Sequence, residues 1–169
     1  MQNLINAENT NMFSEKMATI QLEELSGIFL NIAYQTFALK TSYLERLGQS
    51  KWYDTGIENW AQTELILGFM IRDIQVTTIG KKDRQCDLIV LGHSIELRCA
   101  TRPSSKQLLN AIKEHPKAEL YLFLSKTNGK VINELNSHFE QNNFGEKHKM
   151  LNEQWMVMIV WKNAEVHAN

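Results

Sequence analysis

Three charged residues lie inside two short apolar runs, where an unpaired charge is energetically costly. Asp87 belongs to residues 86–91 (CDLIVL), and Glu96 and Arg98 belong to residues 94–100 (SIELRCA). Two neighbouring carboxylates can hold a divalent cation such as Mg²⁺, which prefers a few protein oxygens together with water and phosphate. A cationic side chain beside them can neutralise the charge that develops on phosphorus. These residue types therefore indicate phosphodiester chemistry.

A hairpin would bring the three residues together. Gly92 opens a two-residue loop between the runs, and Gly supplies the positive φ of a type II′ turn. The sequence predicts the pairs Leu91–Ser94, Ile89–Glu96 and Asp87–Arg98. Because side chains alternate between the faces of a strand, Asp87, Glu96 and Arg98 then share one face, and the two carboxylates are diagonal neighbours. An ordinary cross-strand ion pair between Asp87 and Arg98 is the alternative interpretation.

Hydrophobic periodicity predicts the elements that position this hairpin. Helices are expected over residues 17–47, 57–71, 104–115 and 130–142, and strands over 73–79, 119–124 and 154–161. Residues 143–153 are polar, and no element is predicted there. A meander followed by a crossover helix indicates an α/β fold with a mixed central sheet flanked by helices. We expect a flexible N-terminal arm over 1–16 and a single domain over 17–169.

Glu64 is a further candidate. It falls on the apolar stripe of the helix expected over 57–71, which also carries Trp60 and Leu65. An acidic residue on an inward stripe could supply another carboxylate to the site. The alternative is that Glu64 lies at the edge of the stripe.

This arrangement resembles the PD-(D/E)xK nuclease superfamily, which has a restriction-endonuclease-like fold. The resemblance covers roughly residues 57–125. In that family a helical Glu precedes a strand meander, an Asp opens the second strand, and a Glu-x-Lys lies on the third. Glu64, Asp87 and the segment Glu96-Leu97-Arg98 match these positions. The resemblance implies a Mg²⁺- or Mn²⁺-dependent nuclease that hydrolyses DNA, with Asp87 and Glu96 as metal ligands.

The sequence departs from the family pattern at Arg98, which stands where the family has Lys. A guanidinium stays charged and pairs with carboxylates in a bidentate way, so Arg98 suits stabilisation of a phosphorane but not proton abstraction. Cys86 also replaces the nominal Pro before the Asp. The alternative function is therefore a catalytically inactive nuclease-fold protein that binds nucleic acid or protein, as an inhibitor or assembly subunit. If the protein cuts duplex DNA, so small a domain is expected to act as a homodimer.

Basic residues flank the hairpin on both sides. Lys81, Lys82 and Arg84 form a charged turn before it, and Arg102 and Lys106 follow it. Contact with a phosphate backbone is the functional interpretation of these five residues. A solvated surface is the structural interpretation.

Composition narrows the class of protein. The net charge is −1 and the pI is near 6.5, which gives no global basic field for nucleic acid. No long apolar run or secretory signal is present in the sequence, so we expect no membrane partner and a cytoplasmic location. In that compartment Cys86 and Cys99 are expected to be buried thiols, although a cross-strand disulfide is conceivable.

Overall fold

The computed structural model describes residues 22–49, 53–78 and 86–163 of the 169-residue chain. Within these ranges the centre of the fold is a mixed six-stranded sheet in the order β1-β2-β3-β4-β6-β5. Its strands are β1 (Val76–Thr78), β2 (Leu88–Val90), β3 (His93–Ala100), β4 (Leu120–Lys126), β5 (Phe144–Met150) and β6 (Trp155–Lys162). β3 and β4 are parallel, and the other neighbouring strands are antiparallel. The predicted α/β class with a mixed sheet is confirmed.

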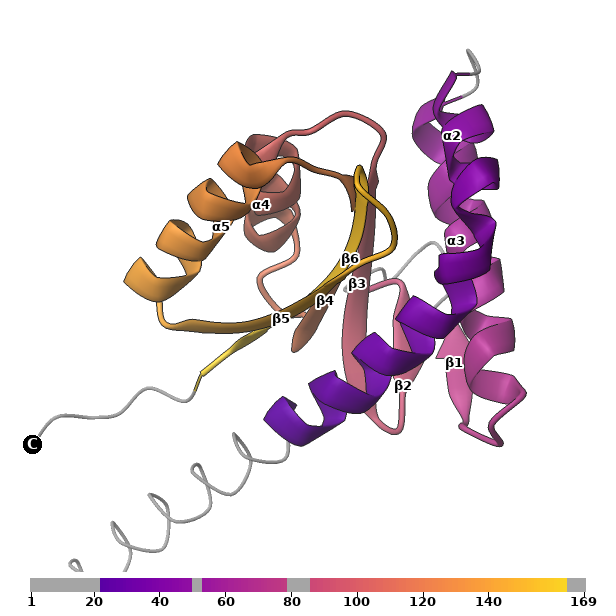
Figure 1. Cartoon of the computed structure of the whole chain (residues 1–169). Coiled ribbons are helices and arrows are strands. Elements are labelled where there is room, and N and C mark those ends of the chain that lie inside the picture. Colours follow the sequence, from indigo (N-terminus) through magenta and orange to yellow (C-terminus); the bar gives the residue numbers. More distant parts are fainter. Residues whose placement is uncertain (1–21, 50–52, 79–85, 164–169) are drawn as a thin grey trace, which may run out of the picture.

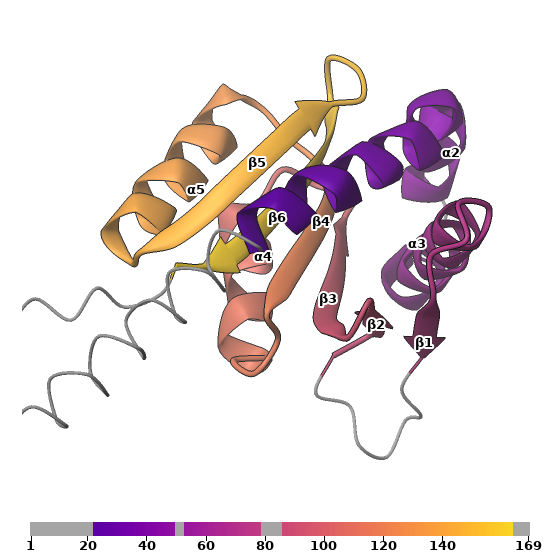
Figure 2. The same cartoon turned by 90° about the horizontal axis from the view of Figure 1, so that it is seen from below.

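Helices cover both faces of the sheet (Figure 1). On one face lie the helical residues 22–37, η1 (Ala38–Lys40), α2 (Thr41–Gln49) and α3 (Tyr53–Met70); on the other lie α4 (Ser105–Glu114) and α5 (Gly129–Gln141). Figure 2 shows residues 22–37 running alongside β5. None of the helices in the described ranges is long and apolar enough to span a bilayer.

Each central strand contributes to two apolar cores because its side chains alternate between faces. Leu97 and Leu122 belong to the core beneath the N-terminal helices, whereas Ala100 and Phe123 belong to the core beneath α4 and α5. β4 is buried along almost its whole length, as a strand with neighbours on both sides and helices on both faces requires. The even-numbered positions of β3 therefore face α4.

Glu45 fixes α2 to the sheet. Its Oε2 accepts a hydrogen bond from Lys126 Nζ at 2.7 Å, and its Oε1 accepts one from Trp155 Nε1 at 2.7 Å. The hydrogen bond from Lys126 lowers the pKa of Glu45, and the bond from Trp155 acts in the same direction, against the effect of burial. We call Glu45, Lys126 and Trp155 the Glu45 site.

Most predicted elements are present with shifted ends. The helix expected over 17–47 is interrupted by η1, and residues 17–21 lie outside the described residues, as does the predicted arm over 1–16. Strand β5 was not predicted. Its side chains are all half-buried or exposed, and they include Lys147, His148 and Lys149, a pattern typical of a sheet edge rather than a core strand. Its ladder with β6 supplies the main-chain hydrogen bonds.

The predicted register of the β2–β3 hairpin is wrong by two residues. Val90 pairs with His93 and Leu88 pairs with Ile95, so Leu91 and Gly92 form the turn, with φ of 52° and 86°. Two positive φ values are typical of a type I′ turn rather than a type II′ turn. His93 belongs to β3 because it pairs with Val90, and Glu119 also contacts its ring and the N–H of Ser94.

Candidate functional site

The outer edge of β3 loses its neighbouring strand after its first few residues. β2 is three residues long, whereas β3 has eight. Beyond the end of β2, side-chain carboxylates replace the missing main-chain acceptors: Asp87 Oδ2 accepts from Leu97 N at 2.9 Å, and Glu58 Oε1 accepts from Cys99 N at 3.2 Å. Two acidic groups from different elements are thereby held at one stretch of strand.

Asp87 and Glu96 are closer neighbours than the sequence predicts. Asp87 N donates to Ile95 O at 3.0 Å, and continuing the hairpin register by one position places Asp87 opposite Glu96. The carboxylate of Asp87 does not lie fully on the Glu96 face, however. It turns toward the edge because its hydrogen-bond donor, Leu97 N, lies in the plane of the sheet. Gln62 of α3 holds the same segment through a bond of 3.1 Å from Nε2 to Asp87 O.

Arg98 joins carboxylates from three elements. Its Nη2 lies 3.3 Å from Glu96 Oε1 on β3 and 3.5 Å from Glu114 Oε2 at the end of α4. Its Nη1 lies 3.5 Å from Glu58 Oε1 on α3. The predicted ion pair of Arg98 with Asp87 is not among the contacts of the described residues, because Arg98 lies two residues beyond the position opposite Asp87.

His115 completes this group from the C-cap of α4. Its Nε2 lies 3.3 Å from Glu96 Oε1, and its carbonyl accepts a hydrogen bond of 2.8 Å from Tyr121 Oη. Burial, and then the nearby charge of Glu96, raise the pKa of Tyr121 to about 12, so it donates this bond over the physiological range. We call the six residues of this site the Arg98 cluster: Glu58, Asp87, Glu96, Arg98, Glu114 and His115.

The charges of the Arg98 cluster affect the pKa values of two buried thiols. Cys86 and Cys99 are both free, as expected for thiols rather than a disulfide. Burial is the main reason that the pKa of Cys86 is raised, and the charges of Asp87 and Glu96 raise it further. Burial likewise raises the pKa of Cys99, with the charges of Glu58 and Asp87 acting in the same direction. The carboxylates therefore act on common neighbours and form one electrostatic unit.

Accessibility differs strongly within the Arg98 cluster. Glu96 is 3% exposed, whereas the side chains of Arg98 and Glu58 are 23% and 28% exposed and that of Glu114 is 60% exposed. Three carboxylates contact one guanidinium in this cluster, and Asp87 adds a fourth carboxylate, so the acidic groups outnumber the cationic ones. Such an excess of negative charge around a partly buried group favours the uptake of a cation.

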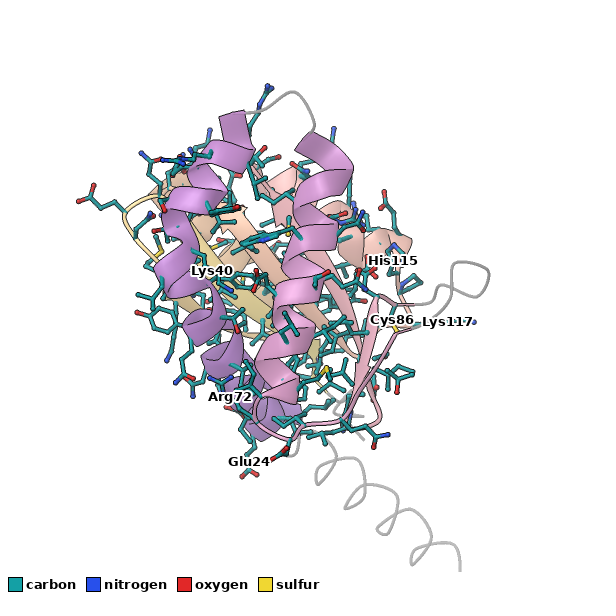
Figure 3. All side chains as sticks on the ribbon, turned by 90° about the vertical axis from the view of Figure 1, so that its right-hand side faces the viewer. Glu24, Lys40, Arg72, Cys86, His115 and Lys117 are labelled. Carbon is teal, nitrogen blue, oxygen red and sulfur yellow. The ribbon has the colours of Figure 1, made fainter. Side chains whose placement is uncertain are left out.

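The structure does not bring Glu64 to this cluster. Glu64 forms an ion pair with Lys40 of η1, and Trp60, one turn before it, stacks on Tyr43 of α2. Glu58 lies on a different side of α3, about 120° away around the helix axis. Figure 3 shows Lys40 on one side of α3 and His115 with Cys86 on the other. The apolar stripe of α3 faces both the sheet and the N-terminal helices, and Glu64 is on the side of the helices.

The sequence analysis missed three residues of the Arg98 cluster: Glu114, His115 and Glu58. For Glu58 the sequence does hold a signal. Glu58 stands next to Ile57, which is 3% exposed, and four residues before Gln62, which also bonds toward the hairpin. The i, i+4 spacing of these two polar residues beside the buried positions 57, 61 and 65 is the signal that could have identified this face.

The predicted nucleic-acid-binding residues fall into two groups. Lys81, Lys82 and Arg84 lie outside the described residues. Arg102, in the connection after β3, and Lys106, in the first turn of α4, are both exposed. These two cations follow the carboxyl end of β3, and among the described residues neither forms an ion pair with the Arg98 cluster.

The donor types of the Arg98 cluster fit a hard divalent cation, although the resting arrangement is not a closed metal cage. Within the described ranges no three His, Cys, Asp or Glu side chains converge closely enough to hold a metal ion. Mg²⁺ does not require three such side chains, since it usually keeps several waters and takes one or two carboxylates. Asp87, directly before β2, and Glu96 of β3 supply two carboxylates, and that of Asp87 is already oriented by a main-chain N–H.

No protein-family model, curated protein or solved structure matches the chain.

Proposed function

We propose that the protein is a metal-dependent nuclease that hydrolyses DNA and has a restriction-endonuclease-like fold. The observation that carries the proposal is the Arg98 cluster, in which Glu58 and Glu96 contact one guanidinium and the Asp87 carboxylate is held at the next residue of β3 by Leu97 N. The order α3-β1-β2-β3-α4-β4, with antiparallel β1, β2 and β3 and a parallel β4, supports the fold assignment. It is the element order that the resemblance of Asp87 and the Glu96-Leu97-Arg98 segment implies.

In this proposal Asp87 and Glu96 hold the cation, which is Mg²⁺ or Mn²⁺. A bound divalent ion would polarise the phosphodiester and make water a better nucleophile at neutral pH. Leu97 N takes no part in the chemistry. It orients the Asp87 carboxylate by donating one hydrogen bond to it. Arg98 holds the scissile phosphate and neutralises the charge that develops on it, since its guanidinium remains protonated.

In this proposal the exposed cations Arg102 and Lys106 bind the phosphates of the DNA backbone. Arg102 and Lys106 follow β3 directly, so they would contact phosphates away from the reacting group. Lys81, Lys82 and Arg84 keep the same proposed role on sequence grounds. A homodimer remains the proposed arrangement for cutting both strands of a duplex.

The experiment that tests the proposal incubates the purified chain with supercoiled plasmid and linear duplex in Mg²⁺, Mn²⁺ or EDTA. We expect ion-dependent cleavage that falls by about 10²-fold or more in Asp87→Asn and Glu96→Gln, because each change removes a charged ligand. Glu140→Gln is the matched control, since Glu140 is an exposed carboxylate in the last turn of α5. Equal cleavage by the wild-type protein and both cluster variants would reject the assignment of the site.

A second candidate is a catalytically inactive nuclease-fold protein that binds nucleic acid or protein. The observation that favours it is the ion pairing of Arg98, which contacts Glu58, Glu96 and Glu114 in the resting structure. Such a protein would bind its partner equally well in EDTA and in Ca²⁺, and no variant of the cluster would change cleavage. Binding that requires a divalent ion and is lost in Asp87→Asn would instead favour the nuclease.

A further inference from the structure

We propose that Glu114 regulates the Arg98 cluster by competing with a DNA phosphate for the Arg98 guanidinium. This inference rests on the proposed function. It gives a role to Glu114, a residue that is not part of the sequence pattern and not a proposed metal ligand.

The three carboxylate partners of Arg98 are held to different degrees. Glu58 is also bonded to Cys99 N, and Glu96 is buried and also contacts His115. Glu114 is the most exposed of the three, and its Oε2 lies 3.5 Å from Arg98 Nη2. An anion arriving from solvent therefore meets the Glu114 side of the guanidinium first and can displace this contact at the lowest cost.

The position of Glu114 runs against local helix energetics. It is the last residue of α4, where the partial negative charge of the helix end disfavours a carboxylate and favours a cation such as the neighbouring Lys113. A charge that conflicts with its own helix yet contacts the central cation of a polar site is a sign of a role outside folding. Its neighbours at this end of α4, His115 and Arg98, belong to the same cluster.

A carboxylate and a phosphate oxygen make the same kind of charge-assisted hydrogen bond to a guanidinium. Glu114 shares Arg98 Nη2 with Glu96, so a phosphate that reaches Nη2 from solvent must displace Glu114 and must also approach a group of four carboxylates. A divalent ion at Asp87 and Glu96 lowers that repulsion, so Glu114 makes phosphate binding depend more strongly on the ion. Removing the Glu114 charge should weaken this dependence.

The test measures duplex binding at low salt in Ca²⁺ and in EDTA for the wild-type protein, Glu114→Gln, Glu140→Gln and Arg98→Ala. We expect Glu114→Gln to bind about twofold to fivefold more tightly in EDTA, the scale of an exposed ion pair, with a smaller gain in Ca²⁺. Glu140→Gln, at the equivalent end of α5, should bind DNA with the affinity of the wild-type protein. In an Arg98→Ala background, Glu114→Gln should no longer increase the affinity for DNA.

A second readout does not need DNA. Phenylglyoxal, which reacts with guanidinium groups, should modify Arg98 faster in Glu114→Gln than in the wild-type protein, as followed by peptide mass spectrometry. Unchanged reactivity together with unchanged DNA affinity would overturn the regulatory role while leaving the nuclease proposal standing. Absence of DNA binding in every variant and ion would overturn both.

Discussion

The Glu45 site and the Arg98 cluster are both partly buried polar sites, but they differ in charge balance and in geometry. At the Glu45 site one carboxylate meets one ammonium and one indole N–H, each at 2.7 Å. In the Arg98 cluster three carboxylates contact one guanidinium at 3.3–3.5 Å, and Asp87 adds a fourth carboxylate. Short and balanced contacts are what a stabilising ion pair needs. The long and acid-rich arrangement is better suited to receiving something from solvent.

The largest effect on stability is expected at the balanced site. Glu45→Ala should lower the free energy of unfolding by about 3 kcal/mol, because it leaves the buried indole N–H of Trp155 and the ammonium of Lys126 without their acceptor. Glu114→Gln, which relieves charge repulsion at an exposed helix end, should stay within about 0.5 kcal/mol of the wild-type protein. Urea unfolding of both variants measures the difference. Equal losses would remove the distinction between the two sites.

Mg²⁺ should stabilise the protein by binding at the Arg98 cluster and not at the Glu45 site. At a hundredfold excess over its Kd, Mg²⁺ is expected to add about 2.7 kcal/mol of stability, or roughly 5 to 10 °C in Tm. The shift should disappear in the double variant Asp87→Asn, Glu96→Gln and persist in Glu45→Gln. A thermal-shift titration with Mg²⁺ and with K⁺ at matched ionic strength measures it. A shift that survives the double variant would place the ion elsewhere.

Tyr121 connects the core to the Arg98 cluster through the carbonyl of His115. Tyr121→Phe should cost about 1 kcal/mol, the usual net value of one hydrogen bond. Ultraviolet titration should show one tyrosine that ionises near pH 12 in the wild-type protein and is missing from the variant. A Tyr121 that ionises with the others would mean that the phenol is not buried beside Glu96.

The smallest expected difference is the change in the stability contribution of Glu45 at acidic pH. The pKa of folded Glu45 lies below the ordinary value of 4.5, so this group stabilises the fold above pH 4.5 and the contribution is lost as the pH falls further. The stability gap between the wild-type protein and Glu45→Gln should therefore narrow below pH 4.5. Melting curves from pH 7 to pH 3 measure it. A gap that widens on acidification would contradict the proposed role of the charge.

The sequence predicted the sheet, the hairpin and the α4 crossover because their apolar runs are local signals. It did not predict the register, since Leu91 at positive φ is not a usual turn residue and Glu119, which contacts His93 at the start of β3, is distant in sequence. Strand β5 was missed because its partner, β6, rather than its own side chains, determines it.

The choice between Glu58 and Glu64 shows the limit of a helical stripe. A stripe identifies buried positions, but α3 packs against two layers, and sequence alone does not say which acidic neighbour faces which layer. The structure assigns Glu64 to Lys40 and Glu58 to Arg98. The interpretation of Asp87, Glu96 and Arg98 as catalytic residues stays a prediction.

The short length of β2 has a consequence for association between molecules. An exposed strand edge with open N–H groups is a template for intermolecular sheet growth. Here the N–H groups of Leu97 and Cys99 already point at charged carboxylates, which an incoming chain would have to displace and desolvate. Asp87 and Glu58, which belong to the candidate site, should therefore also oppose aggregation along β3. Replacing both with alanine should lower the solubility of the protein at high concentration.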